Sequence, residues 1–281
     1  MTVEFVHTLR RLRWQIVCWS AGIALYGLLM ALIYPNMADM SAMLDEYLNM
    51  FPEAMLAFFE NIHALATPMG YLDVYFFSYM HLVAGIIAIS AGTGLLAGDE
   101  EKGVLDLVLA QPISRTSLFL GRFLGLAAAL AIIMAAGWLS WVLPAGHAGL
   151  ELSWLELLLP FLSLLAILLL FAAVAMLLGL VLPAARIAGM VTGALLVGNY
   201  LLLGLSRLND KLAPLMKYTP LYYYQGGMAL SGMRWDWLLG LLLTALCIVT
   251  AAWYLFLKRD IRVGGERSWN ASILRLFART S

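Results

Sequence analysis

Six stretches of this chain are nearly free of charged residues, and each is long enough to cross the hydrocarbon core of a bilayer. A helix rises about 1.5 Å per residue, so about 20 apolar residues span the hydrocarbon. Only 12% of the 281 residues are charged, whereas soluble domains carry about 25%. We therefore predict an all-α integral membrane protein with six transmembrane helices in one transmembrane domain, residues 1–281. The predicted spans are about residues 14–34, 74–97, 123–143, 157–182, 187–206 and 237–257.

The basic residues are divided unevenly between the two sides that six spans define. Thirteen Lys and Arg residues lie on the side of the two termini, and four lie in the loops on the other side. The acidic residues divide in the opposite sense, seven against ten. Because segments rich in Lys and Arg remain in the cytoplasm, we expect both termini to be cytoplasmic.

Three segments outside the spans are predicted to form short helices. Residues 1–13 alternate apolar and basic side chains, which is typical of a helix on the inner membrane surface; a frayed basic end is the alternative. Residues 35–73 and 207–236 are interrupted by Pro and Gly, so we predict short external helices there. The segment 35–73 is rich in Met, which could indicate a soft-metal site but is more typical of packing surface.

Few polar side chains are placed where they could line a path for a solute. His81 lies in the second span and Asn199 in the fifth, while Tyr222 and Tyr223 lie in the external segment 207–236. Polar groups within a membrane are often functional, so these four are candidate residues of a substrate path. A structural histidine and interfacial tyrosines are the alternatives.

The chain lacks the motifs of the common catalytic and cofactor sites. It has no phosphate-binding loop, no HExxH, no Gly-x-Ser-x-Gly and no Cys/His cluster. We therefore predict no catalytic residue, no metal site and no cofactor on this chain, which is not expected to be an enzyme. We expect the chain to be embedded in the lipid bilayer and not to bind nucleic acid.

A charged segment, GDEEKGVLDLVLAQPISRTSLFLGR at 98–122, separates the second span from the third. A charge at the middle of a bilayer costs roughly 2.5–3.5 kcal/mol, so this segment must lie outside the hydrocarbon. The spacing of the apolar residues within 104–109 predicts a short amphipathic helix. Gly103 permits a sharp turn before it, Pro112 ends it, and Ser114 is an N-cap residue for the next helix. An apolar face here favours docking to a partner over a solvated loop.

The string from Glu100 to Arg115 resembles the segment E-x-G-T-L-E-L-L-L-…-P-I/V-S-R of ABC-2 type transporter permeases. The resemblance extends over the chain, from the basic N-terminal segment through six spans to the string FLKRDI at 256–261. Val104 replaces the usual Thr, and Asp106 replaces the usual Glu. In that family the segment is a cytoplasmic coupling helix, which seats in a cleft of a separate ATP-binding subunit.

The resemblance implies a permease subunit of an ABC exporter in the cytoplasmic membrane of a prokaryote. Two ATPase subunits would carry ATP and Mg²⁺, and a second permease would complete the assembly, expected as a homodimer although a heterodimer stays open. The cargo would be a hydrophobic or amphipathic compound. The implied partner-binding residues are Glu100, Glu101 and Gly103 at the first turn, Leu105, Val108 and Leu109 in the partner's cleft, and Pro112, Ser114 and Arg115 at the return.

Two other functions fit the same residues. A metal- or ion-linked permease is favoured if the Met-rich segment or His81 binds metal. A membrane scaffold would use the ATPase for mechanical or signalling work without solute flux.

Overall fold

The structure, a computed structural model, describes residues 1–39, 56, 67–150 and 152–259. Within these residues, six helical segments are long and apolar enough to cross a membrane, and no strand is present. The prediction of an all-α protein with six spans is confirmed. The long helices are α1 (Thr2–Asp39), α5 (Ser78–Leu95), α8 (Arg115–Val142), α9 (Trp154–Val181), α10 (Ala185–Leu208) and α12 (Trp235–Lys258). The second span also includes α4 (Pro68–Leu72) and the π-helix η2 (Asp73–Phe77), which lead into α5.

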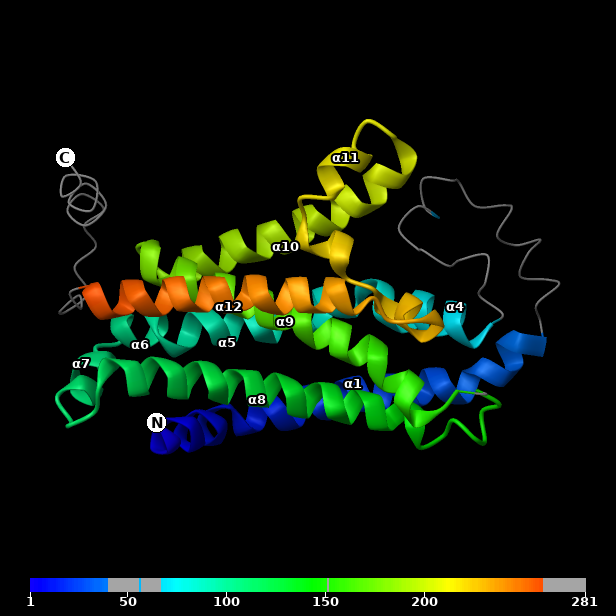
Figure 1. The fold of residues 1–281 in the computed structure, drawn as a ribbon. Helices are drawn as coiled ribbons and strands as arrows, with labels where there is room; N and C mark the ends of the chain where they lie inside the picture. Colours follow the sequence, from blue (N-terminus) through cyan, green and yellow to red (C-terminus); the bar gives the residue numbers. More distant parts are fainter. Residues whose placement is uncertain (40–55, 57–66, 151, 260–281) are drawn as a thin grey trace.

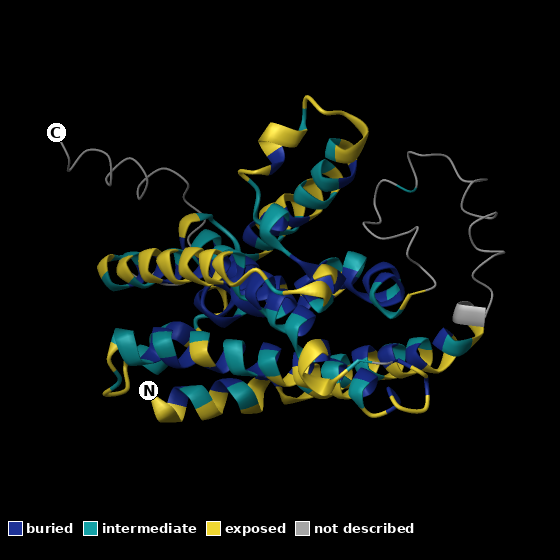
Figure 2. Cartoon of the chain, turned by 45° about the vertical axis from the view of Figure 1, so that its right-hand side comes forward, coloured by how far each residue is buried: buried dark blue, intermediate teal, exposed yellow. Residues whose placement is uncertain are grey.

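The helix α9 lies at the centre of the bundle, where it contacts α5, α8, α10 and α12. Its side chains are apolar on all sides, as a helix surrounded by other helices requires. Two thirds of its most apolar window (67%) is buried, against 17% in α1, 22% in α10 and 28% in α12. Buried residues therefore gather in the middle of the molecule, and the outer helices expose apolar side chains (Figure 2). Broad apolar exposure of this kind suits helices that face lipid or another membrane chain.

The first helix differs from the prediction of a separate surface helix before the first span. Residues 1–13 continue into the span as one helix, so they do not form a separate helix before it. The reason is close packing of α1 along α8 (Figure 1). A Cβ atom on Gly121 would lie 2.6 Å from Cβ of Glu4, and one on Gly125 would lie 2.7 Å from Cβ of Thr8. The two glycines thus let the start of α1 approach the start of α8.

Short helices connect the spans at both ends of the bundle. At one end, α6 (Ala97–Glu101) and α7 (Val104–Leu109) join α5 to α8, and we call this the α7 end. At the other, the α11 end, α11 (Ala213–Met216) and the 3₁₀ helices η3 (Pro220–Tyr223) and η4 (Gly226–Ser231) join α10 to α12. The short helices predicted in 104–109 and in 207–236 are therefore present. Most of the Met-rich segment lies outside the described residues.

Candidate functional site

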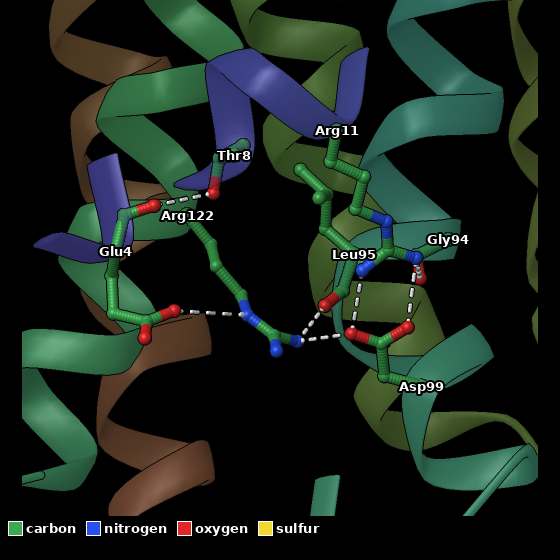
Figure 3. A network of polar contacts seen from close by, with 7 residues as sticks. All are labelled: Glu4, Thr8, Arg11, Gly94, Leu95, Asp99 and Arg122. Carbon is green, nitrogen blue, oxygen red and sulfur yellow. Dashed lines mark hydrogen bonds and ion pairs between the residues drawn. The ribbon is translucent and has the colours of Figure 1, made fainter. Parts of the chain in front are cut away.

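Three consecutive acidic residues connect the short helix α6 to several long helices at the α7 end. The first, Asp99, lies between two arginines (Figure 3). Arg11 of α1 donates from Nη1 and Nη2 to the two carboxylate oxygens, at 2.6 and 2.7 Å. Nη1 of Arg122, from α8, lies 2.8 Å from Oδ2 of the same carboxylate. One carboxylate thus joins α6 to α1 and α8.

Arg122 is buried, with a side chain only 2% exposed, so its charge must be balanced within the protein. In addition to Asp99, it donates to the carbonyl of Leu95, at the C-terminal end of α5. Its Nε lies 4.0 Å from a carboxylate oxygen of Glu4 (Figure 3). The C-terminal carbonyls of a helix carry partial negative charge, so all three neighbours stabilise the cation. This arrangement ties α1, α5, α6 and α8 together.

The next two acidic residues connect α6 to the other helices. A carboxylate oxygen of Glu100 accepts a hydrogen bond from Arg259, just beyond α12, at 3.0 Å. The same arginine donates to the carbonyl of Leu180, near the end of α9, at 2.6 Å. Glu101 accepts a hydrogen bond from the backbone N–H of Ala185 at 2.6 Å. That N–H begins α10 and has no partner within its own helix, so Glu101 stabilises the start of α10.

Arg115, the first residue of α8, is bound to the end of α12. Its Nη1 donates to the carbonyls of Arg259 at 2.7 Å and Leu257 at 3.3 Å, which satisfies C-terminal carbonyls of that helix. The polar contacts therefore run from α6 and the start of α8 to every long helix. We call the following residues the clamp: Arg11, Asp99, Glu100, Glu101, Arg115, Arg122 and Arg259.

The apolar face predicted for α7 points inward rather than outward. Leu105 is only 2% exposed, and Val108 and Leu109 are half-buried against the core of this chain. The prediction that Leu105 packs in a partner's cleft therefore does not fit its position, because an amphipathic helix buries its apolar face on its own bundle. The side chains that face outward are Val104, 39% exposed, and Leu107, 72% exposed.

The turns around α7 agree with the sequence prediction. Gly103 has φ +67°, a left-handed conformation that residues with a Cβ adopt only with strain. Ser114 caps α8, since its hydroxyl accepts the N–H of Ser117 at 3.2 Å. Pro112 is exposed and lies in the bend between α7 and α8. These residues position α7, and the exposed surface of α7 lies between the two turns.

A cavity of about 400 Å³ lies at the α11 end of the bundle. Two of the four candidate residues for a substrate path, His81 and Tyr222, line it. The other two are not among its lining residues. The amide nitrogen of Asn199 donates to a carbonyl of its own helix at 2.7 Å. The hydroxyl of Tyr223 donates to the carbonyl of Lys217 at 3.0 Å.

The charged segment is recognisable from the sequence, but the pairing of its charges is not. Glu100, Glu101 and Arg115 are expected from the sequence to contact a partner, whereas all three are engaged within this chain. Asp99 and Arg122 have no expected role, although both are visible in the sequence as charges close to the spans. Within the described residues, no group of three or more His, Cys, Asp or Glu residues is placed to hold a metal ion.

Residues 7–261 match the family model described as ABC-2 family transporter protein. This range contains α5, α8, α9, α10 and α12 and all but the first turn or two of α1. No curated protein matches the chain.

Proposed function

Because the chain belongs to the ABC-2 family of transporter proteins, we propose that it couples ATP hydrolysis on a separate subunit to export of a hydrophobic or amphipathic compound. The clamp is the observation that carries this proposal. It joins the short helix α6, which leads through the turn at Gly103 into α7, to all six spans through charged and capping contacts. A push on α7 by a partner would therefore move the ends of the spans rather than a loose loop.

The proposed orientation of the bundle in the membrane rests on the charge distribution. The α7 end carries most of the basic residues, which supports a cytoplasmic location for that end and for both termini. The α11 end, with the cavity, would then face the outside of a prokaryotic cell. In this proposed orientation the clamp would lie within reach of a cytoplasmic ATPase.

The outward surface of α7 is the proposed docking site for that ATPase. Val104 and Leu107 are its exposed apolar side chains, and Lys102 and Gln111 are exposed at its two ends. The core of a protein interface is apolar and its rim is polar, and this arrangement of side chains is compatible with that pattern. The buried Leu105 and the acidic residues of the clamp would transmit movement and would not contact the partner.

The complete transporter is proposed to contain two ATPase subunits, which bind ATP and Mg²⁺, and a second copy of this chain. The broad apolar surfaces of α1, α10 and α12 support this assembly, because they offer area for both lipid and a second permease. The cavity favours a transporter rather than a purely mechanical scaffold, since a scaffold needs no space for a small molecule.

The docking site is tested by Leu107→Asp in a tagged chain purified gently from membranes. An ATP-binding protein, identified by photolabelling with 8-azido-ATP, is expected to co-purify with the unaltered chain. A charge at the centre of an interface costs several kcal/mol, so association is expected to fall at least about tenfold in the variant. Stimulated ATP hydrolysis is expected to fall with it.

The matched control is Leu143→Asp, which changes an equally exposed leucine (74%) at the far end of α8. It is expected to leave the ATPase bound. Equal association of the ATPase with the Leu107→Asp chain and the unaltered chain would contradict docking at α7. Absence of any ATP-binding partner in the unaltered preparation would contradict the proposed function itself.

A further inference from the structure

The cavity at the α11 end has the size and the walls of a small-molecule site. Its volume of about 400 Å³ falls in the range of about 300–1,000 Å³ that is usual for such sites. Residues from η2, α5, α10 and α12 and from the short helices α11, η3 and η4 line it. The rings and aliphatic chains in its walls include those of Leu203, Met216, Leu221, Tyr222, Tyr224 and Trp237. A planar apolar body would be accommodated by such walls.

The inner part of the cavity contains a buried histidine with unused hydrogen-bonding capacity. His81 is 1% exposed, and apart from a contact of its ring with the backbone of Phe77, its two nitrogens have no hydrogen-bond partner among the described residues. Its ring lies between those of Tyr200 and Tyr224, at centroid distances of 5.5 and 5.2 Å. Buried polar groups are normally hydrogen-bonded, so an exception requires an explanation. A bound molecule with a polar group at this point would supply the missing partner.

The charged residues that line the cavity are mainly basic. Arg207 and Arg234 line it from the end of α10 and the start of α12, and both are exposed. Arg234 also lies over the ring of Trp237, at 4.0 Å from its centroid, and pairs with Asp236. Asp73 is the acidic residue among the lining side chains, and one of its oxygens accepts the N–H of Gly227 at 2.7 Å. Because Asp236 already balances Arg234, an anionic group at this open rim would meet chiefly the guanidinium of Arg207.

The wall formed by η3 and η4 is held in place before any ligand arrives. Gln225 donates from its backbone N–H to Ser163 of α9 at 3.0 Å. Its side chain also makes two hydrogen bonds with the backbone of Arg234, at 3.1 and 2.7 Å. The hydroxyl of Tyr224 donates to the carbonyl of Phe77 at 3.0 Å. A preformed wall reduces the entropy lost on binding.

We propose that this cavity binds a small amphipathic organic anion with a planar aromatic body. The aromatic body lies between the rings of the wall, a polar group reaches His81, and the anionic group lies at Arg207. The assignment of this anion as cargo rests on the proposed function. Because residues of this chain alone line the cavity, the proposed binding can be tested without ATP or a partner.

The experiment measures binding of 2-naphthoate and of its neutral analogue 2-naphthamide to the full chain in phosphatidylcholine nanodiscs, with empty nanodiscs as the blank. Saturable binding of one naphthoate per chain is expected, with a lower affinity for the amide. Arg207→Gln is expected to weaken naphthoate binding about tenfold and to leave amide binding unchanged, because a charge-assisted contact is lost. His81→Phe is expected to weaken both ligands.

The matched control is Arg186→Gln, an exposed arginine near the other end of α10, which is expected to change neither affinity. Nanodiscs that contain phosphatidylglycerol distinguish two natural ligands for this site. If the anionic lipid reduces naphthoate binding, the natural ligand is a lipid headgroup. If naphthoate binding is undiminished, the natural ligand is a free solute. Unsaturable naphthoate binding, or equal affinities in all three variants, would overturn the proposal. If binding fails while the ATPase still co-purifies, the site is wrong and the proposed transporter stands.

Discussion

At the scale of single residues, the most consequential group in this structure is the buried Arg122. Its charge is balanced by Asp99, by Glu4 and by a helix C-terminus, and it lies where four helices meet. A buried cation of this kind adds little net stability when paired, but removal of a partner leaves an uncompensated charge. The site is therefore much more sensitive to loss of one partner than an exposed ion pair is.

Asp99→Asn tests this sensitivity. The variant retains the size of the side chain and removes its charge, so Arg11 and Arg122 both lose their main anionic partner. Unfolding free energy in detergent is expected to fall by about 3–5 kcal/mol, as for other broken buried pairs. The measurement is denaturant unfolding followed by near-UV circular dichroism.

Asp236→Asn is the control, because it removes an ion pair with Arg234 in which both side chains are more than half exposed. Such pairs contribute about 0–1 kcal/mol. Equal losses in the two variants would show that the Asp99 pair is no more important than a surface contact.

The charged partners could not be predicted from the sequence, although the charges could. The residues Arg11 and Asp99 are 88 positions apart, and Glu100 and Arg259 are 159 positions apart. Nothing in the local spacing of either pair indicates a contact. The turn at Gly103 and the cap at Ser114 were predictable because each depends only on a few neighbouring residues.

At the scale of helices, the packing of α1 against α8 explains why the first helix is continuous. The side chains that would separate the two helices are absent at Gly121 and Gly125, a spacing that is common where membrane helices approach closely. The apolar and basic pattern of residues 1–13 is equally consistent with a surface helix, so the pattern alone led to the wrong expectation. In the structure, Glu4 and Thr8 on this segment are buried against α8.

Gly125→Ala is expected to disturb this contact. The added Cβ would lie 2.7 Å from Cβ of Thr8 and 3.2 Å from the backbone carbonyl of Phe5, so the helices must move apart. Overpacking of this kind costs about 1–3 kcal/mol. The change is measured as a lower midpoint in thermal unfolding of the detergent-solubilised chain.

Gly193→Ala in α10 is the matched control. Apart from its chain neighbours and the nearby backbone of α10, no described atom lies within 4 Å of the added Cβ. Alanine favours a helix over glycine, so this variant is expected to be unchanged or slightly more stable. A loss at Gly193 as large as that at Gly125 would mean that the close approach of α1 and α8 is not the cause.

At the scale of the whole molecule, the spans were predictable and their connection at the α7 end was not. Six apolar runs identify six helices because length and hydrophobicity alone determine what can cross a bilayer. The position of α7 depends instead on which of its faces the bundle buries. That is why Leu107, which faces outward, was assigned no role, and Leu105, which faces inward, was assigned to a partner.

The clamp predicts that the two ends of the molecule are mechanically connected. Arg115 joins the start of α8 to the end of α12, and the other end of α12 lies beside the cavity. Arg115→Gln is expected to leave ATPase docking intact, because the surface at Leu107 is unchanged. It is expected to reduce the response of the α11 end to ATP by more than half, since a push on α7 would reach α12 less directly.

This response can be followed with an environment-sensitive dye on Ser231→Cys, at the exposed end of η4, after Cys18 and Cys247 are replaced by serine. In the purified complex with its ATPase, ATP is expected to change the fluorescence of the dye, and Arg115→Gln is expected to reduce that change. Arg186→Gln, a basic residue outside the clamp, serves as the control and should retain it. A full response in the Arg115→Gln complex would show that movement of α7 reaches the cavity without passing through the contact between α8 and α12.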